Sequence, residues 1–180
     1  MHITVDGFVA GQNGELNWPI TDQDVELAIL DLLNTADTIL LGRIAYKLLS
    51  DFWPTASTQV SVITDKMNTL PKVVFSRTLE NVSWGKWNNA SLIKENIKEE
   101  IIKMKQQPGK NMVLFGGARI AQILINMGLV DEYHLWVQPV SLGHGKPIFK
   151  DKIKLNLLST RAFNSGCVLH CYQPEKAITN

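Results

Sequence analysis

The sequence has 180 residues, a length that suits one globular domain with a sizeable hydrophobic core. Eighteen basic and seventeen acidic residues leave a formal net charge of +1, so the chain has no overall electrostatic field that would attract nucleic acid or a membrane surface. Since no secretory leader opens the sequence and no apolar run reaches the roughly 18 residues of a membrane span, we expect a cytoplasmic protein without nucleic-acid or membrane partners.

The first third of the chain predicts two strands, each followed by a helix. A strand is expected over residues 2–5, and a long glycine-containing loop follows it as far as Trp18. Thr21 and Asp24 have the spacing of a helix capping box, and the apolar residues after them recur at helical spacing. Asp24 is therefore expected to cap this helix. An apolar strand over residues 38–41 then ends at Gly42, where the second helix begins.

The middle of the chain adds a third strand, over residues 72–75, which ends at Ser76-Arg77-Thr78. One guanidinium between two hydroxyls suits a phosphate monoester, although a solvated turn has the same composition. Residues 81–93 show no clean period and predict a loop with a short strand. A helix is expected over residues 94–106, because its apolar residues recur at helical spacing and Pro108-Gly109 stops it.

The central stretch, residues 110–126, predicts a strand, a glycine turn and a helix. Its apolar run ends at Gly116-Gly117, and Ile120 begins a series of apolar residues at helical spacing. Glycines at a helix N-terminus can admit a phosphate or pyrophosphate, whereas a plain tight turn would have the same pattern. The glycine-x-glycine-x-x-glycine motif of the common dinucleotide-binding fold is absent here.

The last third predicts strands. A strand is expected over residues 131–137, a loop over residues 141–147, and an antiparallel hairpin from residues 155–163 and 167–172. His170 lies between Cys167 and Cys171, but strand alternation directs it to the opposite face, so neither a metal site nor a disulfide is expected. One domain is expected over residues 1–174, followed by a polar tail over residues 175–180.

This order of elements predicts an α/β fold with a mainly parallel mixed sheet and an antiparallel C-terminal hairpin. Three of the predicted strands end in groups that could bind an anion. In open α/β sheets, ligands collect at the edge where parallel strands end. We therefore expect an anionic ligand at these three junctions.

Five segments, in this order, resemble the dihydrofolate reductase-like family. In particular, they resemble stand-alone proteins similar to the reductase domain of riboflavin biosynthesis, the C-terminal domain of the bacterial bifunctional deaminase-reductase. The segments are Val5-Asp-Gly-Phe-Val-Ala10, Leu41-Gly-Arg-Ile-Ala-Tyr46, Phe75-Ser-Arg-Thr78, Phe115-Gly-Gly-Ala-Arg119, and Val130-Asp-Glu132 leading to Pro139 and Gly143-His-Gly145. The resemblance implies a three-layer α/β/α fold and a homodimer.

The resemblance also implies an NADPH site. The junction after the second strand would flank the phosphates, and the serine-arginine turn would bind the 2′-phosphate. The two glycines and the start of the next helix would bind the pyrophosphate. A further segment near the N-terminus would line the nicotinamide pocket. The implied cofactor-binding residues are Thr4, Val9, Ala10, Trp18, Gly42, Arg43, Ala45, Phe75, Ser76, Arg77, Gly116, Gly117, Ala118, Arg119 and Ile120.

The implied function is hydride transfer from NADPH to a small unsaturated heterocycle, pterin-like or ribosylaminopyrimidine-like. Alternatives are a dihydrofolate reductase or a 5-amino-6-(5-phosphoribosylamino)uracil reductase proper, and, from another class, a non-catalytic nucleotide-binding module. Phe115 stands where the riboflavin-pathway reductases place a glutamate, and Asp22 and Asp24 are offset from the carboxylate position of dihydrofolate reductases. Asp24 is the candidate proton donor, with a bound water as the alternative. Asp6 is expected to tie its loop by accepting backbone N–H bonds.

Overall fold

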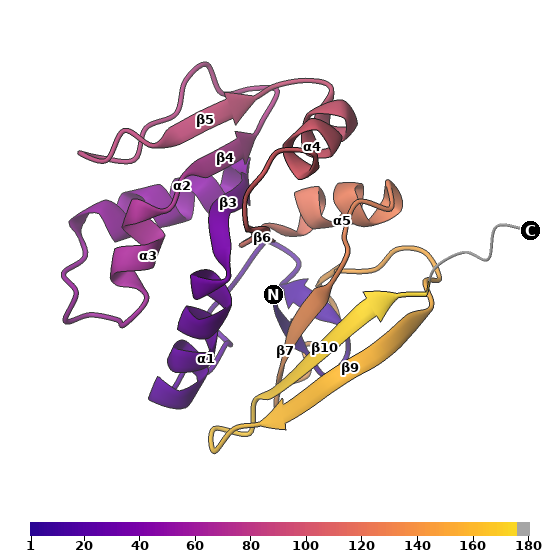
Figure 1. The fold of residues 1–180 in the computed structure, drawn as a ribbon. Coiled ribbons are helices and arrows are strands. Elements are labelled where there is room, and N and C mark those ends of the chain that lie inside the picture. The colour runs from indigo at the N-terminus through magenta and orange to yellow at the C-terminus, as the bar shows by residue number, and fades with distance from the viewer. Residues whose placement is uncertain (176–180) are drawn as a thin grey trace, which may run out of the picture. The chain divides into compact units, whose positions relative to one another are not determined.

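A computed structural model describes residues 1–175 of the chain (Figure 1). These residues form two compact units. The first unit combines Met1–Asp22 with the chain from Ala121 onward, and the second is Gln23–Ile120. Residues 176–180 of the predicted tail lie outside the described residues. Within the described range, no helix is both long and apolar enough to cross a membrane.

The second unit is a parallel sheet with its connecting helices. Its strands are β3 (Ala36–Gly42), β4 (Lys72–Phe75), β5 (Ala90–Ile93) and β6 (Asn111–Leu114). Its helices are α1 (Gln23–Asn34), α2 (Arg43–Phe52), α3 (Thr64–Thr69), α4 (Ile97–Lys105) and the start of α5 (Ala118–Asn126), with a 3₁₀ turn, η1 (Trp53–Thr55), after α2. The predicted parallel sheet is confirmed.

The strand order in this sheet is β5-β4-β3-β6, and all neighbours run parallel. The chain goes outward from β3 through β4 to β5, then returns past them to place β6 on the other side of β3. Crossovers between parallel strands are right-handed. The crossover from β3 to β4, which contains α2, and the crossover from β5 to β6, which contains α4, run in opposite directions across the sheet. The two helices therefore lie on opposite faces of the sheet, as Figure 1 shows. The central strand is accordingly buried on both faces, with Ile39, Leu40 and Leu41 in the core.

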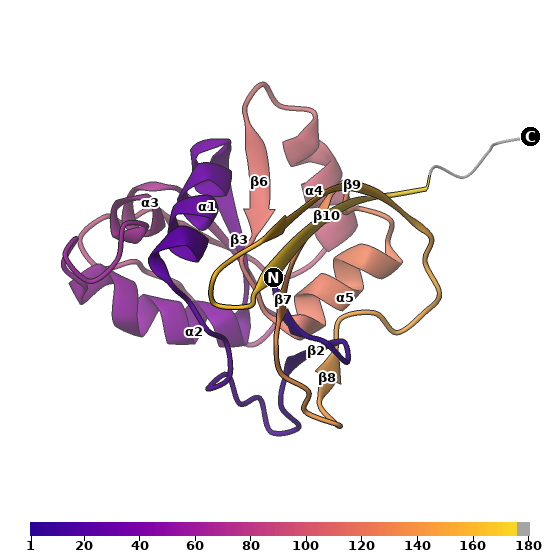
Figure 2. The ribbon, with the colours of Figure 1, turned by 90° about the horizontal axis from the view of Figure 1, so that it is seen from below.

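The first unit contains the remaining strands, which are β1 (His2–Thr4), β2 (Phe8–Ala10), β7 (Tyr133–Gln138), β8 (Lys146–Pro147), β9 (Leu155–Ala162) and β10 (Val168–Pro174). One sheet has the order β1-β7-β10-β9, in which β1 runs parallel to β7 and the other neighbours are antiparallel. The antiparallel C-terminal hairpin is therefore confirmed. A separate antiparallel pair joins β2 to β8 (Figure 2).

Three local predictions need correction. The first helix begins at Gln23, so Asp22 rather than Thr21 precedes it, and Asp24 lies inside its first turn. The helix predicted from residue 94 begins only at Ile97, because Asn96 adopts a left-handed φ of 53° that an α-helix cannot continue. Both α3 and β2 were missed, since six and three residues are too few to show a period.

A buried lysine organises the polar interior of the second unit. Lys72 is only 1% exposed, and its Nζ donates to the Asn68 carbonyl oxygen at 2.7 Å. The ammonium also lies 4.4 Å from the ring centroid of Trp84, whose indole N–H donates to Asn68 Oδ1 at 2.9 Å. Burial lowers the pKa of Lys72 to about 7.

Candidate functional site

The three strand ends expected to bind an anion lie next to one another. Strands β4, β3 and β6 are adjacent and parallel, so their carboxyl ends meet at one edge. Gly42 at the end of β3 is in register with Phe75 at the end of β4. On the other side, the Gly42 N–H donates to the Gly116 carbonyl oxygen at 2.8 Å. The chain leaves β3 toward β4 on one side, and it reaches β6, on the other side of β3, only later from β5. Ligands of open α/β sheets bind where the strand order changes direction in this way.

Gly42 allows β3 and α5 to approach closely. A β-carbon at this position would lie 2.9 Å from Cγ2 of Ile120, closer than packed atoms tolerate. Gly42 is also the residue before α2, and no side chain caps that helix. The first N–H groups of α2 therefore point toward this edge without a side-chain acceptor.

The two glycines after β6 differ in whether the backbone conformation and the packing require a glycine. Gly116 has a φ of +135°, a conformation that side chains disfavour, and a β-carbon there would lie 3.3 Å from Cβ of Ala45. The peptide bond between Gly116 and Gly117 is cis. Gly117 has no such φ, and a β-carbon there would meet nothing within 4 Å. Neither its φ nor its packing requires glycine at this position, and open space adjoins the start of α5.

Each of the three junctions also carries an exposed arginine. Arg43 is the first residue of α2, Arg77 follows β4 by two residues, and Arg119 lies in the first turn of α5. No ion pair holds any of these guanidinium groups within residues 1–175. Free guanidinium groups offer forked donors that match phosphate oxygens. The arrangement suits a ligand with several phosphates.

Ser76 shapes the turn that carries Arg77. Its Oγ accepts hydrogen bonds from the backbone N–H groups of Thr78 and Leu79, both at 3.2 Å. The hydroxyl proton remains able to donate, with Thr78 Oγ1 at 3.4 Å as its protein neighbour. Phe75 and Ile120, by contrast, are buried in the core, so each could contact a ligand only through its backbone.

The residues expected at the nicotinamide belong to the first unit. Thr4 is buried, and its hydroxyl donates to Asp6 Oδ1 at 2.5 Å while it accepts from the Phe8 N–H at 3.0 Å. Val9 and Ala10 are buried in β2. Trp18 is half-buried, and its indole N–H donates to the Glu15 carbonyl oxygen at 3.2 Å.

Asp6 accepts hydrogen bonds from backbone N–H groups, as predicted, but these groups belong to residues 142 and 143 and not to the loop that follows Asp6. Its carboxylate accepts from the Thr4 hydroxyl, from the Ser141 hydroxyl at 2.7 Å, and from the N–H groups of Leu142 at 3.1 Å and Gly143 at 2.7 Å. These hydrogen bonds, that of Thr4 foremost, hold the pKa of Asp6 well below its usual range.

Asp24, the candidate proton donor, is exposed in the first turn of α1. A carboxylate there interacts favourably with the positive end of the helix dipole. The structure thus supplies a stabilising role for this side chain, and its role as an acid stays a prediction.

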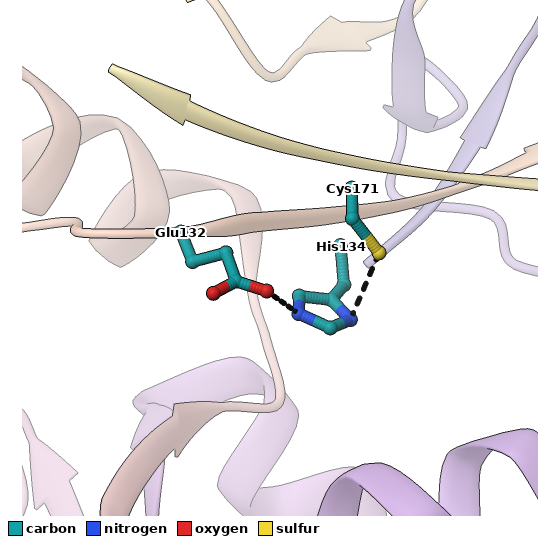
Figure 3. Close-up of side chains that lie close together, drawn as sticks. All are labelled: Glu132, His134 and Cys171. Atoms are coloured by element: carbon teal, nitrogen blue, oxygen red, sulfur yellow. Dashed lines mark hydrogen bonds and ion pairs between the residues drawn. The ribbon is translucent and has the colours of Figure 1, made fainter. Parts of the chain in front are cut away.

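A cluster that no sequence pattern indicated comprises Glu132, His134 and Cys171, whose potential ligand atoms lie within 4.8 Å of one another (Figure 3). His170, the histidine considered from the sequence, instead contacts Thr160 Oγ1 at 2.9 Å. Only the pairing of β7 with β10 brings His134 opposite Cys171. No local sequence signal could have shown this pairing.

Comparisons with known proteins agree with this fold. A family model described as the RibD C-terminal domain matches residues 1–169. The protein YyaP of Bacillus subtilis (strain 168), uncharacterised itself, is 41% identical over 178 residues, covering 94% of this chain and 90% of the relative.

Two solved structures extend the comparison. A protein from Shewanella sp. PV-4 that is assigned to riboflavin biosynthesis has a TM-score of 0.76 at 20% identity, covering 98% of this chain and 97% of that chain. Dihydrofolate reductase from Enterococcus faecalis, solved with NADP(H), has a TM-score of 0.64 at 13% identity, covering 97% and 94%. At these identities the two structures establish the fold alone, which is dihydrofolate reductase-like.

Proposed function

Because the chain belongs to the family of RibD C-terminal domains, we propose that it is an NADPH-dependent oxidoreductase acting on a small unsaturated heterocycle, pterin-like or ribosylaminopyrimidine-like. The heterocycle class rests on the relatives, which include a riboflavin-biosynthesis assignment and a dihydrofolate reductase. The observation that carries the proposal is the edge where β4, β3 and β6 end. It combines the open space at Gly117 with three arginines that form no ion pair with the described residues 1–175.

The groups at this edge fit the adenosine and phosphate part of NADPH. The pyrophosphate would occupy the open space beside Gly117, where the N–H groups at the start of α5 can donate to its oxygens. The uncapped N-terminus of α2 adds further donors from Gly42 onward. Arg43 and Arg119 would neutralise the phosphate charge. When bound, the cofactor supplies the hydride, and the chain's own groups position it.

Arg77 would select NADPH over NADH. Its guanidinium is exposed and has no ion-pair partner in the part of the chain that the structure describes, and the turn at Ser76 places it at the end of β4. Only NADPH has a 2′-phosphate for this group to bind. A charge-assisted hydrogen bond contributes about 1.5 to 3 kcal/mol, which corresponds to roughly a ten- to hundredfold difference in affinity.

Titrations of NADPH and NADH against the variant Arg77→Ala test this selection. We expect the NADPH affinity to fall roughly ten- to a hundredfold while the NADH affinity hardly changes. Arg77→Lys should restore only part of the loss, because lysine lacks the planar fork. The control is Arg161→Ala, which removes an exposed arginine from β9 in the other unit. Equal losses for both cofactors in Arg77→Ala would contradict the assignment.

Turnover is tested by following the loss of NADPH absorbance with a panel of pterins, pyrimidines and quinones. Oxidation of NADPH with a pterin or a ribosylaminopyrimidine would support the reductase and identify its substrate class. Tight NADPH binding without turnover on any member of the panel would instead identify a non-catalytic nucleotide-binding module.

The predicted homodimer is also a proposal. Two surfaces are candidates for its interface, the C-terminal hairpin and the apolar strand over residues 133–137. The latter lies in a central strand with Tyr133, Leu135 and Trp136 in the core, so the hairpin is the better candidate. Strand β9 is an edge strand, and its Leu157 and Leu158 are 58% and 47% exposed. Exposed apolar edge strands readily pair with another chain. A monomer mass by light scattering at micromolar concentration would exclude the dimer, and Leu158→Lys should weaken it.

A further inference from the structure

The cluster of Glu132, His134 and Cys171 joins two central strands of the first unit. His134 on β7 is directly opposite Cys171 on β10, so both side chains project from the same face of the sheet. Glu132 lies just before β7, two residues before His134, and its carboxylate contacts the imidazole. Figure 3 shows the imidazole between the carboxylate and the thiol. The site thus has a rigid base, because β7 and β10 each have strand neighbours on both sides.

The two ring nitrogens of His134 have different partners. Nε2 lies 2.5 Å from Glu132 Oε1, and Nδ1 lies 3.6 Å from Cys171 Sγ. In the tautomer that donates Nε2–H to the carboxylate, the lone pair of Nδ1 faces the sulfur. Histidines that bind metals commonly donate their second ring N–H to a carboxylate in this way, which fixes the orientation of the ring.

The spacing of sulfur and nitrogen matches a tetrahedral ion. With bonds of about 2.3 Å to sulfur and about 2.0 to 2.1 Å to nitrogen, tetrahedral geometry separates the two ligand atoms by about 3.6 Å. The observed Sγ to Nδ1 separation is 3.6 Å. The two ligand atoms are therefore already at the separation that a tetrahedral ion requires.

We propose that Cys171 Sγ and His134 Nδ1 bind a thiophilic divalent cation of the Zn²⁺ type, with Glu132 orienting the imidazole from its far side. Water completes the coordination, and binding releases the thiol proton to solvent. Cys171 is 6% exposed, whereas the His134 and Glu132 side chains are 25% and 50% exposed, so the ion enters past the imidazole and carboxylate. The ion would clamp β7 to β10 and stabilise the folded chain by mass action.

Cobalt titration of the reduced, chelator-treated full chain tests the site, because a thiolate bound to Co²⁺ gives a charge-transfer band that carboxylates and imidazoles do not. We expect the wild-type protein to develop this band and Zn²⁺ to abolish it by displacing the cobalt. The matched control is Cys167→Ser, which removes the other buried thiol, whose Sγ lies 3.4 Å from Gln138 Nε2. This control should keep the band, and Cys171→Ser should lose it.

Glu132→Gln decides the question if Cys171→Ser fails to fold, since Glu132 is half-exposed and its replacement leaves the core intact. Loss of an orienting carboxylate typically weakens metal affinity about ten- to a hundredfold, and we expect that change for both Co²⁺ and Zn²⁺. The proposal is overturned if the wild type gives no band, if Cys171→Ser retains it, or if Glu132→Gln binds as tightly as wild type. The first result would show that the thiol only hydrogen-bonds to His134.

Discussion

Replacing Gly117 by alanine tests whether the open space after β6 is a ligand site. A β-carbon there meets nothing within 4 Å, so the free energy of unfolding should change by less than about 1 kcal/mol. The same methyl group would occupy the space proposed for the pyrophosphate. Losing one charge-assisted hydrogen bond costs about 1.5 to 3 kcal/mol, so the dissociation constant for NADPH should rise roughly ten- to a hundredfold.

Gly42→Ala is the matched control, because its β-carbon would lie 2.9 Å from Cγ2 of Ile120. Overpacking of this kind costs about 1 to 3 kcal/mol of stability. For a chain of this size, each kcal/mol lowers the melting temperature by about 2 to 4 °C, which gives a fall of roughly 2 to 12 °C. The two alanine substitutions therefore differ in which property they change most.

Thermal unfolding and a fluorescence titration with NADPH measure both properties for both variants. We expect Gly117→Ala to retain the wild-type melting temperature and to lose NADPH affinity. A folded Gly117→Ala that binds NADPH as tightly as wild type would refute the ligand site. A loss of stability equal to that of Gly42→Ala would refute the inference that the space beside Gly117 is open.

Burial lowers the pKa of Lys72 from 10.5 to about 7, so between these pH values the unfolded chain binds more protons and stability rises with pH. The rise in the free energy of unfolding, measured by urea unfolding, should be on the order of 4 kcal/mol, and Lys72→Met should remove most of it. The control Lys98→Met, at an exposed lysine, should keep the rise. Parallel curves of unfolding free energy against pH for the Lys72 variant and wild type would contradict the burial argument. The lowered pKa of Asp6 means that its stabilising contribution is present above about pH 4 and is lost as acid protonates the carboxylate. Asp6→Asn should therefore be less stable than wild type at pH 7, with a difference that shrinks on acidification; a difference independent of pH would argue against the charge. Asp24→Asn tests both roles of this side chain once a substrate is known: a fall in kcat at constant stability would support Asp24 as the acid, and a loss of stability alone would support its role at the start of α1.

Much of the fold, and the adjacency of the three strand-end junctions, could be predicted from the sequence because the signals are local. The strand Lys72–Phe75 was predicted with its observed ends, and each glycine junction lies between an apolar run and a helical period. The rule that parallel strands end at one edge then placed Gly42, Ser76 and Gly116 together before the structure did.

The features that were missed depend on contacts between distant segments. Lys72 resembles an ordinary polar strand end in the sequence, and only the packing of Trp84 over its ammonium group reveals the burial. The cluster at Cys171 depends on strand register, which joins residues 37 positions apart. The first-helix boundary was wrong by a residue or two, an ordinary uncertainty for caps.

The hydrogen bonds that converge on Asp6 have a consequence for local motion. One carboxylate holds the hydroxyl of Thr4 together with the amides of Leu142 and Gly143, and the Thr4 hydroxyl in turn holds the amide of Phe8. Opening either loop breaks the shared set of bonds, so neither loop can fluctuate without the other. Amide hydrogen exchange at these positions should therefore follow a single cooperative opening event, although Phe8 and Gly143 lie far apart in the sequence.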